Sequence, residues 1–211
     1  MLKQLLRKWR YGDEIIVVTG LPRSGTSMMM KMLEAGGLPI MTDHVRTADE
    51  DNPKGYYEFE RVKDLEKETD KSWVREARGK VLKVISHLLR ELPEENFYRV
   101  IFMRRDLDEV LASQNKMLER RGEPNPVSDA KAREAYRSHI IDSKVFLRTH
   151  PNFELLEVHY TQALDDPQSL AERVSQFLER RVEPGDLVSA VDPQLYRNRK
   201  AQLGTGSTPV R

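Results

Sequence analysis

Hydrophobic and polar residues follow two patterns along this chain: short apolar runs, and longer stretches in which apolar residues recur with the period of a helix. Two of the runs, residues 15–18 and 100–103, are apolar at every position. Such runs are typical of strands that helices cover on both faces. We therefore predict an α/β fold of three layers, with a central, mostly parallel sheet flanked by helices. Its strands are expected at residues 14–19, 81–86, 98–104 and 153–158.

Start and stop signals mark the helices between these strands. One helix opens with acids after Asp106 and ends with bases before Gly122, which matches the helix dipole and the usual terminal residues. Another is expected to have Thr26 or Ser27 near its N-cap and to end at Gly36. Helices are expected over residues 26–35, 58–69, 106–121, 129–148 and 166–180.

The N-terminal stretch, residues 1–12, is basic and amphipathic, with leucines and Trp9 among lysines and arginines. It lacks the apolar core of a signal peptide, and no apolar run in the chain is long enough to span a membrane. We interpret it as an N-terminal basic helix that docks ahead of the first strand. A role at a membrane surface is the alternative.

Composition limits the classes of function to be considered. The formal net charge is +1 although 33% of the residues are charged, so no long-range field that attracts nucleic acid is indicated. The absence of cysteine excludes disulfides and thiolate chemistry and suits a cytoplasmic protein. With 211 residues and no repeat, the chain is interpreted as one domain over residues 1–211, with a mobile tail over residues 201–211.

A glycine-bounded loop follows the first strand. Residues 20–27 have the spacing of a phosphate cradle, in which backbone N–H groups and a helix N-terminus surround an anion. Thr26 stands where loops that bind nucleoside triphosphates carry a lysine, so the usual contacts to ATP or GTP are missing. The nearest fixed cation is Arg23. This pattern favours a P-loop-like fold that binds a different anion.

A second anion-binding element lies where the strand over residues 98–104 ends. Arg105 follows that strand, and Ser113 lies about two turns into the next helix. We expect the guanidinium and the hydroxyl to converge on a second phosphate. P-loop enzymes that use magnesium place a carboxylate at such a strand end. Arginines stand there instead, so we predict chemistry that requires no metal.

Together these elements resemble those of sulfotransferases that use 3′-phosphoadenosine-5′-phosphosulfate (PAPS), of the bacterial type related to protein-tyrosine and cytosolic enzymes. Residues 20–27 are similar to the family's 5′-phosphosulfate loop, and Arg105 with Ser113 matches its 3′-phosphate motif. Tyr160, followed by Asp166 and Pro167, is a third similarity. The resemblance implies transfer of a sulfuryl group from PAPS to a hydroxyl or amine.

The resemblance also implies roles for individual residues. Arg23 would stabilise the leaving phosphate, an electrostatic role of the oxyanion-hole type. A late basic segment would reach the 3′-phosphate through Arg197 or Arg199, with Arg105 and Ser113. The residues implied to hold the 5′-phosphosulfate are Pro22, Arg23, Ser24, Gly25, Thr26 and Ser27.

The acceptor must lose a proton as it attacks, so a general base is required within hydrogen-bond reach. Asp43 and His44 stand where the tyrosine-sulfating enzymes, which they resemble in spacing, carry a glutamate pair. Glu58 follows in the same polar region. His87 is included because cytosolic relatives place a histidine after a comparable strand, in a Lys-Thr-His triplet. The order of preference is Asp43, Glu58, His44, His87.

The acceptor class stays open at this stage. Residues 39–73 and 121–129 are expected to wall its pocket, and their mixture of tyrosines, acids and bases fits a small alcohol, a phenol, a glycan or a peptide. One alternative function is a P-loop phosphotransferase such as a nucleotide kinase, against which the missing lysine argues. Another is a nucleotide-binding module without catalysis, which would show no turnover.

Overall fold

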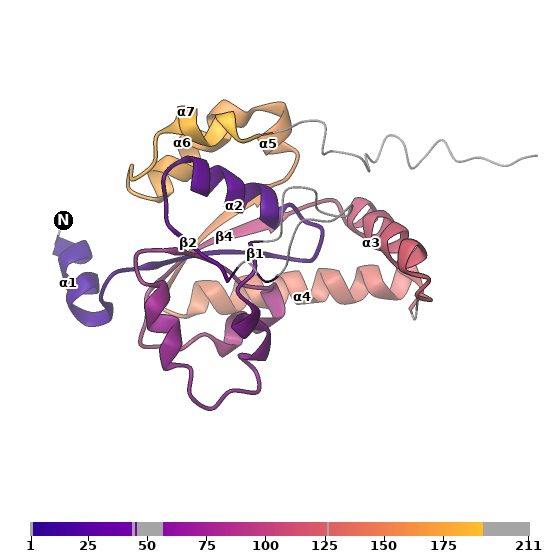
Figure 1. Ribbon diagram of the computed structural model, residues 1–211, viewed down its shortest axis with the longest axis horizontal. Helices are drawn as coiled ribbons and strands as arrows, with labels where there is room; N and C mark the ends of the chain where they lie inside the picture. The colour runs from indigo at the N-terminus through magenta and orange to yellow at the C-terminus, as the bar shows by residue number, and fades with distance from the viewer. Residues whose placement is uncertain (1, 44, 46–56, 126, 192–211) are drawn as a thin grey trace, which may run out of the picture.

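The computed structural model describes residues 2–43, 45, 57–125 and 127–191 (Figure 1). The candidate base His44, the candidate phosphate ligand Arg197 and the tail over residues 201–211 lie outside the described residues. So do residues 46–56, which form part of the expected acceptor wall.

A five-stranded sheet forms the centre of the molecule. Its order is β2-β3-β1-β4-β5, and every paired strand is parallel to its neighbour. The central strand β1 is buried at all its positions, as its apolar run predicted. The strands are β1 (Ile15–Gly20), β2 (Ile40–Met41), β3 (Val81–Lys83), β4 (Tyr98–Arg104) and β5 (Phe153–His159).

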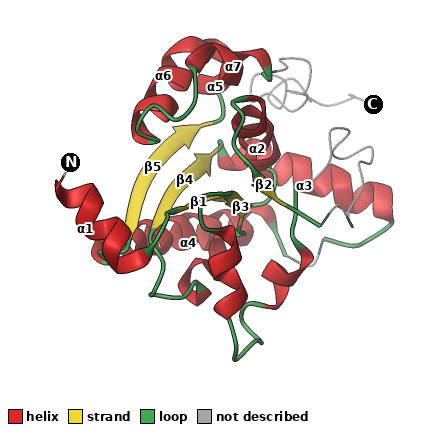
Figure 2. Ribbon diagram, turned by 60° about the vertical axis from the view of Figure 1, so that its left-hand side comes forward, coloured by secondary structure: helices red, strands yellow, loops and turns green. Residues whose placement is uncertain are grey.

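Helices cover both faces of this sheet, because successive strand residues point to opposite sides. Ile16 and Val18 pack with one group of helices, whereas Ile15 and Val17 pack with the other. The first group is α2 (Thr26–Ala35), α6 (Pro167–Phe177) and α7 (Pro184–Ser189), and the second contains α4 (Asp129–Thr149) and the 3₁₀ segments η1 (Glu60–Asp64), η2 (Ser72–Ala77) and η3 (Ser86–Glu91). Figure 2 shows these two layers on either side of the sheet, which confirms the predicted three-layer α/β fold.

Three further helices complete the described elements. They are α1 (Leu2–Tyr11), α3 (Leu107–Arg121) and α5 (Gln162–Asp165). The ends of α3 are confirmed, since the Asp106 side chain accepts a hydrogen bond from the backbone of Asp108 and Gly122 closes the helix at a φ of 66°. No helix among the described residues combines the length and the apolar character that crossing a membrane requires.

Several element predictions were wrong in detail. Residues 58–69 form the short 3₁₀ segment η1 and turns instead of an α-helix. The strand expected over residues 81–86 stops at Lys83, because the chain turns into η3 at Ser86. The elements β2 and α7 were not predicted, since two and six residues are too few to show a period.

Candidate functional site

The loop between β1 and α2 has the backbone of an anion cradle. Gly25 is the N-cap of α2 at a φ of 98° and makes no side-chain cap, and Thr26 and Ser27 follow it as the first two helical residues, near the N-cap as expected. Arg23 also has a positive φ, 68°, which is uncommon for a residue with a side chain. Without a side-chain cap, the first N–H groups of the helix point into the loop, where they favour an anion.

Close packing explains both glycines of the loop. A Cβ at Gly20 would lie 2.6 Å from the Met103 carbonyl oxygen, and a Cβ at Gly25 would lie 2.4 Å from Cδ2 of Tyr160. No side chain fits at either distance. The loop therefore lies directly against the carboxyl ends of β4 and β5, beside the second anion-binding element. Among the loop side chains, Pro22 is exposed and Ser24 is buried.

The two anion-binding elements are joined by hydrogen bonds. Arg23 Nε donates to Ser113 Oγ at 2.9 Å, and Arg105 Nη1 donates to the Arg23 carbonyl oxygen at 3.2 Å. The Arg105 guanidinium also lies over the Tyr160 ring, with its Cζ 4.7 Å from the ring centroid. The structure thus brings Arg23, Arg105 and Ser113 together in one cluster, as their positions at neighbouring strand ends suggested.

Glu109 holds Arg105 in this cluster. Arg105 Nε donates to its Oε2 at 2.8 Å, and both side chains are buried, 9% and 2% exposed. A buried carboxylate of this kind is stable only when paired. Glu109 was not singled out on sequence grounds, although it stands in the first turn of α3, four residues after Arg105.

Lys83, the last residue of β3, adds a cation beside the loop. Its Nζ lies 3.3 Å from Ser27 Oγ and 3.5 Å from Oε1 of Glu58. Strand β3 pairs with β1 such that Lys83 lies opposite Val18, just before the cradle. Lys83 was given no role on sequence grounds, because its place beside the cradle depends on the pairing of β3 with β1, which no local pattern shows.

The candidate bases differ in their surroundings. Glu58 contacts Lys83 and also lies 3.3 Å from Lys63 Nζ, so it belongs to the cluster around the loop. Asp43 accepts backbone N–H bonds from Glu60 at 2.6 Å and from Val45 at 3.1 Å. Burial raises the pKa of Asp43, but these backbone hydrogen bonds outweigh it and hold the pKa below its ordinary value. Asp43 has the geometry of a loop cap.

The histidine candidate lies in a different setting. His87 is exposed on η3. Its neighbour in sequence, Ser86, makes a 2.8 Å hydrogen bond with Nε2 of His139 on α4. Burial, followed by the nearby charge of His87, lowers the pKa of His139. The segment η3, which carries His87, therefore lies beside α4.

A groove with a volume of about 950 Å³ opens beside Arg105 and Tyr160. It runs between the second half of α4, the start of α3 and the ends of β4 and β5. Its basic lining consists of Arg104, Arg105, Arg137, Lys144, Arg148 and His159. Arg105 therefore belongs both to the cluster with Arg23 and Ser113 and to the lining of this basic groove.

Comparison with known families decides what kind of protein carries this site. The sequence model of the sulfotransferase domain matches residues 13–202. The chain belongs to the sulfotransferase family. Comparison of this sulfotransferase with curated protein sequences gives no significant match.

Two solved structures are similar to this sulfotransferase at low identity. A sulfotransferase domain from the curacin biosynthetic pathway is 15% identical with a TM-score of 0.52, over 85% of this chain and 78% of that one. Mouse sulfotransferase SULT7A1, solved with PAP, is 15% identical with a TM-score of 0.47, over 92% of this chain and 66% of that one. The first of these likenesses supports the α/β fold.

Proposed function

We propose that this sulfotransferase moves a sulfuryl group from PAPS to a hydroxyl or amine acceptor. The observation that carries the proposal is the Arg23–Ser113 hydrogen bond, which joins the cradle after β1 to the arginine element after β4. A ligand with anionic groups at two ends matches such a double site. Family membership supports the same reaction class.

The donors of the site suit this co-substrate. In this proposal the cradle from Pro22 to Ser27 holds the 5′-phosphosulfate through the N-terminus of α2. Arg105 and Ser113 hold the 3′-phosphate, to which Arg197 is proposed as a further ligand. Ser24 Oγ is buried and makes no hydrogen bond with the described residues, so the cradle keeps an unsatisfied polar group.

Cations at the cradle are proposed to stabilise the charge that develops during transfer. PAPS supplies an activated sulfuryl group, and its departure leaves charge on the nucleotide 5′-phosphate. Arg23 and Lys83 are the cations placed to offset that charge, from the loop and from the end of β3. No metal ion is required in this scheme, because fixed side-chain charges and helix N–H groups do the stabilising.

Glu58 is the base that we favour, ahead of Asp43. Its carboxylate lies in the same cluster as Lys83 and the cradle. The Asp43 carboxylate is occupied by backbone N–H groups, and its lowered pKa makes it a weaker proton acceptor. We propose that Lys83 and Lys63 hold the Glu58 carboxylate in place and orient it towards the acceptor.

Calorimetry with the product nucleotide, 3′-phosphoadenosine 5′-phosphate (PAP), tests the proposal. We expect binding in the presence of a chelator, with loss of affinity in Arg105→Met. Arg75→Met is the matched control, because Arg75 pairs at the surface with Glu95. Failure to bind PAP, together with binding of ATP only in the presence of magnesium, would instead indicate a phosphotransferase.

Mass spectrometry of a metabolite extract incubated with the protein and isotopically labelled PAPS then identifies the acceptor. A binding module without catalysis would label no metabolite.

A further inference from the structure

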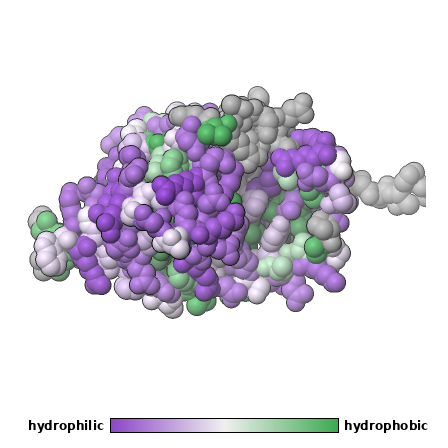
Figure 3. All heavy atoms as spheres, turned by 60° about the horizontal axis from the view of Figure 1, so that its bottom comes forward, coloured by the Kyte–Doolittle hydropathy of each residue, from purple (hydrophilic) through white to green (hydrophobic). Residues whose placement is uncertain are grey.

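Helix α1 exposes its apolar side chains to solvent. Leu5 is 62% exposed, Leu6 59% and Trp9 88%. A helix that only docked ahead of the first strand would bury these residues, as amphipathic helices do. Figure 3 shows hydrophobic atoms at the left-hand end of the molecule, where α1 lies, although most of that face is hydrophilic.

The opposite face of α1 makes the contacts with the protein. Tyr11 is buried against Phe97, with ring centroids 5.9 Å apart. Arg7 lies over the same Phe97 ring, with its Cζ 4.6 Å from the centroid. At about 100° per residue, Arg7 and Tyr11 share one side of the helix, whereas Leu5, Leu6 and Trp9 share the other.

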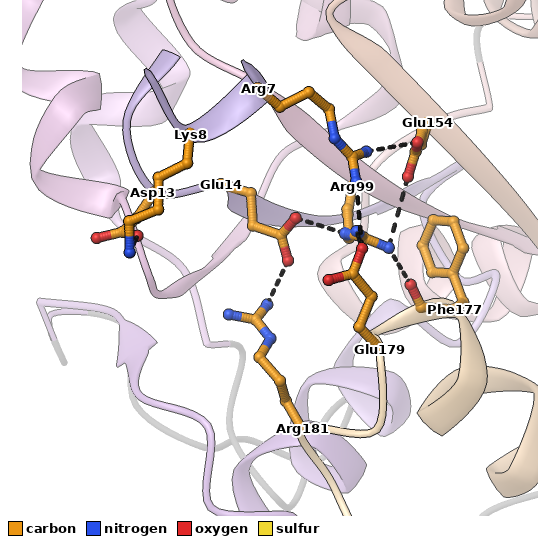
Figure 4. A network of polar contacts seen from close by, with 9 residues as sticks. All are labelled: Arg7, Lys8, Asp13, Glu14, Arg99, Glu154, Phe177, Glu179 and Arg181. Atoms are coloured by element: carbon orange, nitrogen blue, oxygen red, sulfur yellow. Dashed lines mark hydrogen bonds and ion pairs between the residues drawn. The ribbon is translucent and has the colours of Figure 1, made fainter. Parts of the chain in front are cut away.

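An ionic network around the buried Arg99 fixes this orientation. Arg7 donates to Glu154 at 2.5 Å and to Glu179 at 3.2 Å. Both carboxylates also pair with Arg99, whose side chain is 4% exposed, and Figure 4 shows the group converging from separate elements. Turning α1 to bury its apolar face would break these pairs and leave charges unpaired.

The charge of α1 indicates what its exposed face contacts. Its ten residues include Lys3, Arg7, Lys8 and Arg10 and no acid. Lys8 and Arg10 are exposed and flank the apolar face on its two sides. Tryptophan and leucine between cations are typical of helices that lie in the interface of an anionic bilayer.

We propose that α1 binds an anionic membrane surface. Leu5, Leu6 and Trp9 enter the headgroup region, and Lys8 and Arg10 lie beside anionic headgroups. Strand β1 begins next to α1 and ends at the cradle (Figure 1). At a rise of about 3.3 Å per residue, its six residues place the cradle about 20 Å from the start of the strand. The membrane-bound protein therefore keeps its anion site open to water.

Sedimentation with vesicles tests the proposal. We expect the full chain to bind vesicles of phosphatidylcholine that contain about one-third phosphatidylglycerol, and to bind pure phosphatidylcholine on the order of tenfold more weakly. High salt should weaken the binding to anionic vesicles. The double variant Leu5→Gln/Trp9→Gln should lose at least about tenfold in affinity. Val127→Gln is the matched control, because it removes an exposed apolar side chain elsewhere.

Trp9 itself reports insertion. The chain has two tryptophans, and the other, Trp73, is buried. A blue shift of emission on anionic vesicles should therefore vanish in Trp9→Phe while binding persists. PAP affinity and the unfolding midpoint should be unchanged in the α1 variants, since α1 lies at the other end of β1.

Three outcomes would overturn the proposal. The first is equal binding to both vesicle types, and the second is unaltered binding by the double variant. The third is a dimer in solution that the double variant converts to monomer, because a second copy would then be the occupant of this face. Light scattering after gel filtration measures that state.

Discussion

Arg23 and Ser113, far apart in sequence, are joined by a 2.9 Å hydrogen bond from Nε to Oγ. The bond holds a loop residue of positive φ against a buried hydroxyl of α3. It joins the two candidate anion-binding elements and orients the Arg23 guanidinium. Orientation of this kind lowers the cost of ordering side chains on binding.

Ser113→Ala removes that bond, and we expect PAP affinity to fall about tenfold. The substitution removes both a donor for the proposed 3′-phosphate and the acceptor that orients Arg23, and a hydrogen bond to a charged group contributes roughly 1.5 kcal/mol. Calorimetry measures the change. Ser189→Ala, at an exposed serine whose hydroxyl donates to the Asp186 carbonyl, should leave affinity unaltered. Equal PAP affinities in the two variants would show that Ser113 does not contribute to PAP binding.

Gly25→Ala should destabilise the fold by about 2 kcal/mol or more and abolish PAP binding. The new methyl would meet Tyr160 at 2.4 Å, at a φ of 98° that side chains rarely adopt. Urea unfolding measures the loss. Gly37→Ala separates the two causes, because Gly37 has a φ of 80° and nothing within 4 Å of an added Cβ. We expect Gly37→Ala to cost about 1 kcal/mol and to keep PAP binding. Equal costs would show that the contact with Tyr160 is relieved.

Lys83→Met should lower kcat by about a hundredfold or more while changing PAP affinity much less. Lys83 lies beside Ser27 and Glu58, where we propose that charge develops in the transition state, so its effect should appear in turnover. Steady-state kinetics and calorimetry together measure the two effects. Lys67→Met removes an exposed lysine paired with Asp64 and should change neither. Loss of PAP binding with unaltered kcat would make Lys83 a ground-state ligand only.

The elements that the sequence predicted best are those with a continuous apolar run or with clear capping residues at their ends. The apolar run of β4 and the Asp106 and Gly122 ends of α3 were read correctly, because burial on both faces and helix capping leave local marks. The 3₁₀ segment η1 was missed, since a helical pattern does not separate an α-helix from a tighter turn.

The cluster residues show the same division. Arg23, Arg105 and Ser113 stand in motifs whose spacing is local, and the parallel sheet brings them together. Lys83 and Glu58 meet only because β3 lies beside β1 and the chain returns past the cradle. Contacts of that kind depend on strand order, which no local pattern contains.

Asp43→Asn should weaken the fold at neutral pH and lose this effect in acid. The lowered pKa of Asp43 means that the ionised carboxylate stabilises the folded chain above a pH of about 4, its unfolded pKa. That contribution disappears as the pH falls through the folded-state pKa. Chemical unfolding across this range should therefore show the variant and the parent converging. Asp13→Asn, at a surface carboxylate paired with Lys8, serves as the control. A gap that stayed constant into acid would mean that ionisation of Asp43 is not the cause.

Glu58→Gln separates the proposed base from the loop cap. We expect kcat to fall about a hundredfold or more with PAP affinity retained, because the amide keeps the shape of the side chain but accepts no proton. Asp43→Asn should instead lower stability, with a smaller effect on kcat. Glu60→Gln is the matched control, since Glu60 shares the partner Lys63 with Glu58. If Asp43→Asn removed turnover at full stability while Glu58→Gln did not, the proton would go to Asp43, and the hydrogen bonds from Val45 and Glu60 would have to open in the reacting complex.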